Sequence, residues 1–161
     1  MNIEFFLNDT LNTINSDPLT RLSDLLRDNF DLHRFSRGCN KGECGLCIVL
    51  MDNKPVLSCL VPAFRVKEKR IITYEGFRDS EDCNDIETGF TEAGFSPCKL
   101  HKISYVFLVH YLLERVSHPG ETEIAAYFAG FHPICGGYSA LRDGIDKAAA
   151  LRFIRHNEQA R

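Results

Sequence analysis

The feature that most constrains this chain is the spacing of four cysteines in its first half. Cys39, Cys44 and Cys47 are separated by four and then two residues, and Cys59 follows after a longer interval. This is the plant-type spacing for a 2Fe–2S cluster. Four thiolates must converge on two irons, so one loop supplies three closely spaced ligands and the fold brings in the fourth. The sequence therefore predicts that these four cysteines bind a 2Fe–2S cluster.

Glycines in the same loop support this interpretation. Gly38, Gly42 and Gly45 permit positive φ and let backbone amides approach the bridging sulfides. Hydrogen bonds from N–H groups to sulfur offset the negative charge of a cluster and tune its potential. The alternatives are a structural zinc site and buried free thiols. Zinc sites more often use two Cys-x-x-Cys pairs, and only Cys44 and Cys47 form such a pair here, so a cluster is favoured.

Composition excludes several classes of function. The 161 residues include 19 Lys and Arg against 22 Asp and Glu, for a net charge of −3. This balance, without a long basic block, indicates that nucleic acid is not a partner. No Lys or Arg precedes Arg21, and the longest apolar stretch, 103–113, is too short to span a bilayer. We therefore expect a cytoplasmic protein without a membrane partner, whose seven cysteines serve metal or redox chemistry rather than disulfides.

Hydrophobic patterning divides the chain into two parts. The first part has short β-rich segments around one amphipathic helix, and the second has apolar residues at helical spacing. We expect strands at 3–7, 10–15, 48–51, 55–57 and 70–74, a helix from Pro18 to Phe30, and helices at 86–95, 100–116, 122–129 and 140–156. The polar segment 78–85 between the two parts is a predicted connector. Cys83 lies in it with no ligand-type neighbour, so we expect a free surface thiol.

The chain also resembles a known family. The run 39–60, the segments 7–8, 24–27 and 72–77, and Pro18 are similar to the iron–sulfur subunit of the molybdenum hydroxylases. That family includes xanthine dehydrogenase, aldehyde oxidoreductase and aerobic carbon monoxide dehydrogenase. Segments 114–129 and 136–138 resemble the C-terminal half of the same subunit. The resemblance therefore covers nearly the whole chain.

The resemblance implies an α+β fold and an electron-transfer role. A β-grasp plant-type ferredoxin domain is expected over 1–77, a connector over 78–85 and a small four-helix bundle over 86–161, with one 2Fe–2S cluster in each domain. Electrons would pass from molybdenum through the helical-domain cluster and then the ferredoxin-domain cluster to FAD. The chain itself would be a non-catalytic subunit of an oxidoreductase complex. Molybdopterin and FAD are expected only on partner chains, namely a molybdenum-cofactor large subunit and an FAD-containing subunit.

The family pattern breaks at the second cluster. Members usually hold it with a Cys-x-x-Cys and with a Cys-x-Cys just before a Gly-Tyr. Here Cys98 matches the first cysteine, but His101 replaces the second. Cys135 matches the last cysteine, but Pro133, which cannot ligate a metal, replaces the third. His132 is the neighbouring substitute, so the predicted second site consists of Cys98, His101, His132 and Cys135.

Three interpretations fit this second set. Two thiolates and two imidazoles hold a 2Fe–2S cluster of raised potential, by loose analogy with Rieske centres, or they hold a tetrahedral zinc ion. In the third interpretation the site has lost its metal, leaving polar histidines and two cysteines that pack as small hydrophobes. A lost or zinc-filled site predicts a single-cluster, ferredoxin-like carrier, or an assembly module whose helical domain docks on a partner.

Overall fold

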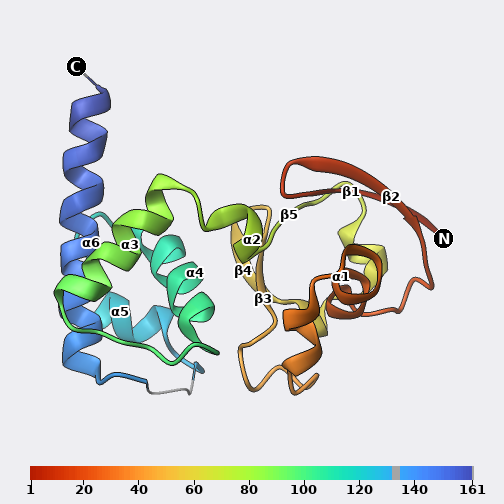
Figure 1. Ribbon diagram of the computed structural model, residues 1–161, viewed down its shortest axis with the longest axis horizontal. Coiled ribbons are helices and arrows are strands. Elements are labelled where there is room, and N and C mark those ends of the chain that lie inside the picture. Colours follow the sequence, from red (N-terminus) through yellow and green to blue (C-terminus); the bar gives the residue numbers. More distant parts are fainter. Residues whose placement is uncertain (132–134, 161) are drawn as a thin grey trace. The chain divides into compact units, whose positions relative to one another are not determined.

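The computed structural model describes residues 1–131 and 135–160, which form two compact units, 1–77 and 78–161. In the first unit the elements are β1 (Asn2–Leu7), β2 (Thr10–Asn15), α1 (Leu22–Phe30), η1 (His33–Arg37), β3 (Ile48–Met51), β4 (Lys54–Leu57), η2 (Ser58–Leu60), η3 (Ala63–Val66), β5 (Arg70–Ile72) and α2 (Tyr74–Phe77). In the second unit they are α3 (Glu81–Glu92), α4 (Lys102–Leu113), α5 (Glu121–Tyr127) and α6 (Tyr138–Gln159). Strands followed by helices confirm the predicted α+β class (Figure 1).

The strands of the first unit form one mixed sheet in the order β2-β1-β5-β3-β4. Strands β1 and β5 are parallel, and the other neighbours are antiparallel. The β1–β2 hairpin turns at Asn8 and Asp9, which both have positive φ, as a tight two-residue turn between twisted strands requires. The hairpin predicted from this Asn-Asp pair is confirmed.

Helix α1 and the sheet share one apolar core. Alternate residues of β1, including Ile3 and Phe5, are fully buried, as expected for a strand with one covered face. Leu22, Leu25 and Leu26 lie on one face of α1 and belong to the same buried cluster. This core anchors the loop that carries the first three cysteines, because the loop joins η1 to β3.

Helix α1 begins four residues later than predicted. Pro18 does not start the helix: it lies in a turn in which the Asp17 carboxylate accepts the Leu19 N–H at 2.7 Å. Arg21 then has extended backbone and bridges Pro62 in antiparallel fashion, and the Leu22 N–H donates to the Val61 carbonyl. These long-range backbone bonds hold residues 18–21 outside the helix despite their helical sequence pattern.

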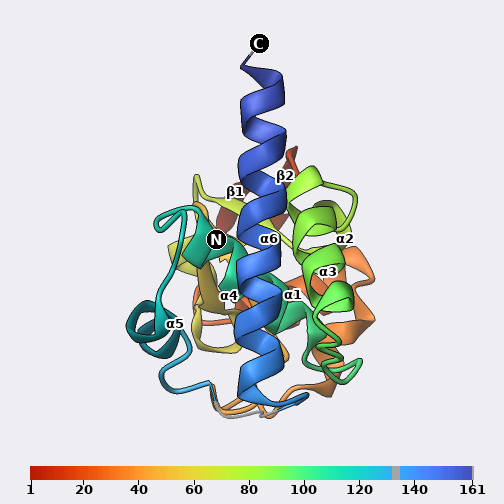
Figure 2. The same ribbon diagram turned by 90° about the vertical axis from the view of Figure 1, so that its left-hand side faces the viewer.

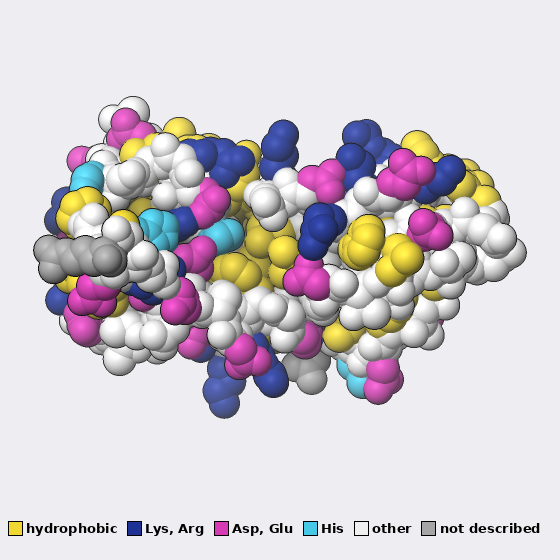
Figure 3. Space-filling view, turned by 90° about the horizontal axis from the view of Figure 1, so that it is seen from above, with side chains coloured by type: hydrophobic (Ala, Val, Ile, Leu, Met, Phe, Trp, Pro, Cys, Tyr) yellow, Lys and Arg dark blue, Asp and Glu magenta, His cyan; other side chains and the backbone are white. Residues whose placement is uncertain are grey.

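In the second unit, α3 packs closely along the long helix α6 (Figures 1 and 2). Glycine makes the approach possible, because a Cβ at Gly89 would lie 2.6 Å from the Gly144 carbonyl oxygen and the Ala148 nitrogen on α6. None of the described helices is long and apolar enough to cross a membrane. On the face drawn in Figure 3, acidic and basic side chains are interspersed.

Helix α3 begins inside the segment that the sequence predicts as a connector. The Ser80 side chain caps it by accepting the Cys83 N–H at 3.1 Å, and residues 81–85 are already helical. Cys83 is only 1% exposed, so the prediction of a surface thiol is wrong. The polar residues that suggested a linker are instead paired: Arg155 of α6 donates to Asp82 and Asp85.

Asp82 is the centre of this ion-pair network. His110 and Arg152 both lie within 3.7 Å of its carboxylate, and Arg155 donates to it as well. The hydrogen bond with His110, followed by the charge of Arg152 and a hydrogen bond from Arg155, holds the pKa of Asp82 far below its ordinary value of 3.8 despite partial burial. The network therefore ties α3, α4 and α6 together through one carboxylate.

We predict that Asp82→Asn lowers the free energy of unfolding by about 1–3 kcal/mol at neutral pH, because Arg152 and Arg155 lose a partly buried anion. The folded-state pKa is depressed, so this stabilisation is complete above pH 3.8 and disappears as the pH falls through the lower folded value. Urea unfolding of both proteins, followed by circular dichroism at several pH values, measures it. Asp79→Asn, at a carboxylate 85% exposed, is the matched control and should change little. Equal stabilities of wild type and Asp82→Asn at pH 7 would contradict this assignment.

Candidate metal centres

The first four predicted ligands come together in the first unit. Cys39, Cys44 and Cys47 lie on the loop between η1 and β3, and Cys59 lies on η2 directly after β4. The β3–β4 hairpin joins them, since Ile48 pairs with Leu57 in its register. Just beyond that pair, the backbone N–H and the hydroxyl of Ser58 donate to the Cys47 carbonyl at 3.1 and 2.7 Å.

The four cysteines are arranged as two pairs. Cys39 and Cys44 exchange backbone-to-sulfur hydrogen bonds, with N···Sγ distances of 3.3 and 3.4 Å, and their thiols also interact. The Cys47 and Cys59 thiols interact and are each 3% exposed, and Cys59 also interacts electrostatically with Cys39. Cys39 and Cys44 are less buried. One pair is therefore nearer the surface and the other belongs to the core.

Backbone N–H groups lower the pKa of Cys39, one member of the outer pair. The Cys39 sulfur accepts N–H groups of Lys41, Cys44 and Glu43 at 3.3–3.4 Å, which lowers the pKa of Cys39 to about 6. Burial, reinforced by the Cys47 thiol, raises the pKa of Cys59 to about 12. The Cys39 thiol therefore ionises more readily than an ordinary cysteine, whereas Cys59 must release its proton as a metal binds before it can act as a ligand.

Two of the three loop glycines have the predicted backbone conformation. Gly42 and Gly45 have φ of 79° and 72°. A Cβ at Gly42 would also lie 2.6 Å from Leu60 Cδ1, and the Gly42 N–H reaches the Cys59 sulfur. Gly38 differs from the prediction, because its φ of −85° belongs to ordinary extended backbone. The turn toward positive φ is made at Asn40 instead, a residue type that tolerates this region.

The sequence pattern does not identify Arg34, whose half-buried guanidinium contacts the backbone at the end of the cysteine loop. It donates to the Leu46 and Ile48 carbonyls at 3.5 and 3.1 Å, on either side of Cys47. Its Nε lies 3.3 Å from a Glu75 carboxylate oxygen, and it interacts electrostatically with Cys47. Burial lowers the pKa of Arg34, but the guanidinium group remains charged. No local motif marks this residue, because its partners are backbone carbonyls twelve and fourteen positions away.

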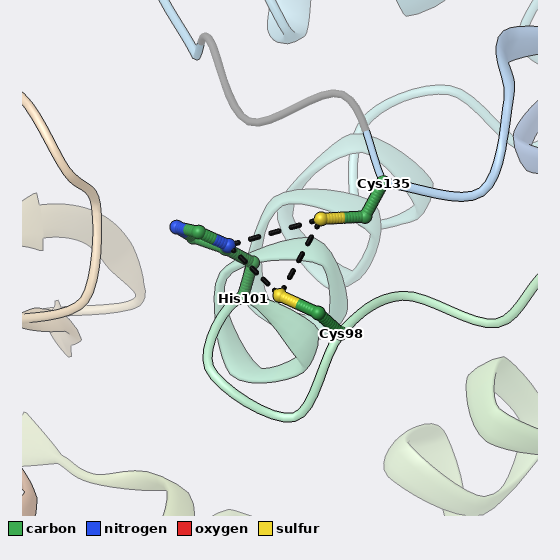
Figure 4. Close-up of side chains that lie close together, drawn as sticks. All are labelled: Cys98, His101 and Cys135. Atoms are coloured by element: carbon green, nitrogen blue, oxygen red, sulfur yellow. Dashed lines mark hydrogen bonds between the residues drawn. The ribbon is translucent and has the colours of Figure 1, made fainter.

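Three of the four residues predicted for the second site also come together. Cys98 lies in the loop before α4, His101 is the N-cap of α4, and Cys135 lies shortly before α6. Their side chains point toward one another (Figure 4). The distances are 3.0 Å from Cys98 Sγ to His101 Nδ1, 3.4 Å between the two sulfurs, and 3.8 Å from Cys135 Sγ to His101 Nδ1. His132, the fourth predicted ligand, lies outside the described residues.

Aromatic side chains pack against the residues of the second set. The buried Tyr105 hydroxyl accepts the Cys135 N–H at 3.2 Å, and the Tyr105 ring packs edge-on against Phe95 and Phe131. The backbone after Cys135 turns through Gly136, with φ of 83°, where a Cβ would lie 2.9 Å from the Phe95 ring. The Gly-Gly before α6 thus has a local structural cause, namely a positive-φ turn packed against an aromatic ring.

Backbone hydrogen bonds also activate Cys98. The N–H of His101, followed by its imidazole, lowers the pKa of Cys98 to about 7. A further group of ligand-type residues, Asp82, His110 and Glu114, lies in the second unit, but its carboxylates are paired with Arg152 and Arg155. Those cations make that group an ion-pair network rather than a metal site.

Comparison with known proteins places the chain in a family, although no family model matches it. It is 32% identical over 151 residues to the nicotinate dehydrogenase small FeS subunit of Eubacterium barkeri, covering 91% of this chain and 96% of that protein. It is 31% identical over 124 residues to a probable subunit of xanthine dehydrogenase from Bacillus subtilis, covering 77% of this chain and 71% of that protein.

Solved structures agree. Quinoline 2-oxidoreductase from Pseudomonas putida 86 superimposes with a TM-score of 0.78 at 26% identity, covering 97% of this chain and 96% of that one. The aldehyde oxidoreductase from Desulfovibrio desulfuricans gives a TM-score of 0.79 at 28% identity, covering 94% of this chain but 17% of the longer protein. With this similarity over nearly its whole length, the chain belongs to the small iron–sulfur subunits of the molybdenum hydroxylases.

Proposed function

We propose that this chain carries a 2Fe–2S cluster on Cys39, Cys44, Cys47 and Cys59 and transfers single electrons within a multi-subunit molybdenum hydroxylase. In this role it passes electrons between a molybdenum-cofactor large subunit and an FAD-containing subunit. The observation that carries the proposal is the arrangement of the four thiols as two contacting pairs. The names of relatives that are subunits of larger enzymes support the existence of partner chains.

Two pairs of thiols suit two irons. In a 2Fe–2S cluster each iron takes two protein ligands, and the bridging sulfides separate one pair from the other. Here Cys39 and Cys44 form one pair, and Cys47 and Cys59 form the second. The cluster supplies one reversible electron between its two oxidation states. Ligand chemistry and arrangement therefore both favour a 2Fe–2S cluster over a single zinc ion at this site.

The residues around the cysteines stabilise negative charge. N–H groups of Lys41, Glu43 and Cys44 point at the Cys39 sulfur, and the Gly42 N–H points at the Cys59 sulfur. Such donors stabilise an anionic cluster, and more so when it is reduced. Arg34 adds a full positive charge on the buried side, next to Cys47. These groups act on the potential and take no part in bond chemistry.

We assign this centre to a ferredoxin-like domain over residues 1–77 and the second cysteine–histidine set to the helical domain that follows. The compact units 1–77 and 78–161 support this division. The helical domain starts at α3, so the connector is shorter than the segment 78–85. The ligand role of His132 in the second set stays a prediction.

Replacing Cys47 by Ala should abolish the visible charge-transfer absorption of the cluster and reduce bound iron to background, because the buried pair loses a ligand. Optical spectra and iron analysis of anaerobically reconstituted protein measure this. Cys83→Ala, which removes a buried thiol from the other unit, is the control and should retain the full spectrum. Retention of the absorption in Cys47→Ala would refute the ligand assignment.

Replacing Arg34 by Met should lower the reduction potential on the order of 50 mV, about tenfold in a one-electron equilibrium constant, because a cation that favours the reduced cluster is lost. Arg34→Lys should lie close to wild type, since it keeps the charge. Arg27→Met, at an arginine of α1 paired with Asp24 and Asp28, is the matched control. Redox titration followed by EPR measures the potential in samples of equal iron content. An unchanged potential in Arg34→Met would exclude this electrostatic role.

A further inference from the structure

The three described residues of the second set have the dimensions of a single-ion site. The distances of 3.0, 3.4 and 3.8 Å between their donor atoms define a triangle whose circumscribed circle has a radius of about 2.0 Å. One ion slightly above that plane lies at zinc–nitrogen and zinc–sulfur bond lengths, about 2.0–2.3 Å, from all three donors. In a regular tetrahedral zinc site such donors lie roughly 3.6–3.8 Å apart, so adjustments of at most about 0.6 Å suffice.

The same distances do not suit a 2Fe–2S cluster. A cluster needs two ligands on each of two irons, so a third ligand belongs to the other iron, beyond the bridging sulfides. Here Cys135 Sγ contacts both Cys98 and His101. Three mutually close donors cannot be divided between two irons unless at least one of them moves away. The first centre differs in this respect, since among the described residues no three of its four thiols form a mutually close group of this kind.

Charge distinguishes the two centres. Zn²⁺ with two thiolates and one neutral imidazole is electrically neutral, whereas a 2Fe–2S cluster held by four thiolates, as proposed for the first centre, is anionic. At the second set the Cys98 sulfur accepts the N–H groups of His101 and Leu100 at the start of α4. At the first centre the N–H groups of five loop residues, 39, 41, 42, 43 and 44, point at cysteine sulfurs. The smaller set of donors is sufficient for a neutral site.

We propose that Cys98, His101 and Cys135 bind one zinc ion in place of the second iron–sulfur cluster. Thiolate and imidazole together form a donor set typical of zinc. Three donors on one side of the ion leave a fourth tetrahedral position. The zinc ion ties the start of α4 to the segment that precedes α6 and carries no electron. The chain then has one redox-active centre, and electrons pass through the first unit alone.

Metal analysis of the full chain, reconstituted anaerobically with iron, sulfide and zinc, tests the proposal. We expect about two irons and about one zinc per chain. Cys98→Ser, His101→Ala and Cys135→Ser should each weaken zinc binding by more than about 100-fold in a competition titration with a chromophoric chelator, without loss of iron or visible absorption. Cys83→Ser is the control for loss of a thiol elsewhere in the same unit and should keep its zinc.

Two further variants allow a failure of this proposal to be distinguished from a failure of the proposed function. Cys47→Ala should lose iron and keep zinc, so failure at one centre is visible independently of the other. His101→Cys should keep zinc, because thiolate replaces imidazole as a donor, and this rescue distinguishes a ligand from a residue that only supports the fold. Circular dichroism verifies that each variant is folded.

Cobalt substitution gives a second measurement that needs no variant. Co²⁺ in the wild-type site should show the intense d–d bands of tetrahedral coordination and a thiolate-to-cobalt charge-transfer band. The proposal is overturned by about four irons per chain with a second EPR signal that disappears in Cys135→Ser. It is equally overturned if the wild-type chain binds zinc with a dissociation constant above about 1 μM, or if the cobalt form shows the weak spectrum of octahedral coordination.

Discussion

The pairing of β3 with β4 is the interaction on which the first candidate metal centre depends. It aligns Ile48 with Leu57, and the two bonds from Ser58 to the Cys47 carbonyl continue this alignment past the end of the ladder. Without it, Cys59 would be an isolated cysteine far from the loop. The register of this strand pair therefore places the Cys59 thiol next to the three thiols of the loop, which local sequence spacing alone cannot do.

The two centres are built on different supports. The first uses a loop closed by a hairpin, with Arg34 holding the carbonyls on either side of Cys47. The second uses His101 at the start of α4 and two cysteines in the loops that precede α4 and α6, supported by the Tyr105 ring and hydroxyl. Both supply N–H groups to sulfur, because a loop with positive φ and a helix N-terminus each leave backbone donors unpaired.

Sequence reasoning predicted what depends on local pattern. The hairpin at Asn8 and Asp9, the sheet-then-helices order and the convergence of Cys98, His101 and Cys135 follow from turn chemistry, periodicity and family spacing. The errors have long-range causes. Arg21 leaves the helical pattern because it bridges Pro62, and the acidic start of α3, where Cys83 is buried, is paired with Arg155, some seventy residues away.

Arg34 shows why such features escape a sequence pattern. The role of Arg34 depends on its contacts with two backbone carbonyls and one thiol. None of these partners can be identified before the loop is folded. The same holds for the distinction between cluster and single ion at the second set. Residue types allow both, and only the distances between donors separate them: two pairs suit two irons, and one triangle suits one ion. In our proposal, the replacement of cysteine by histidine at the second set accompanies a change from two metal atoms to one.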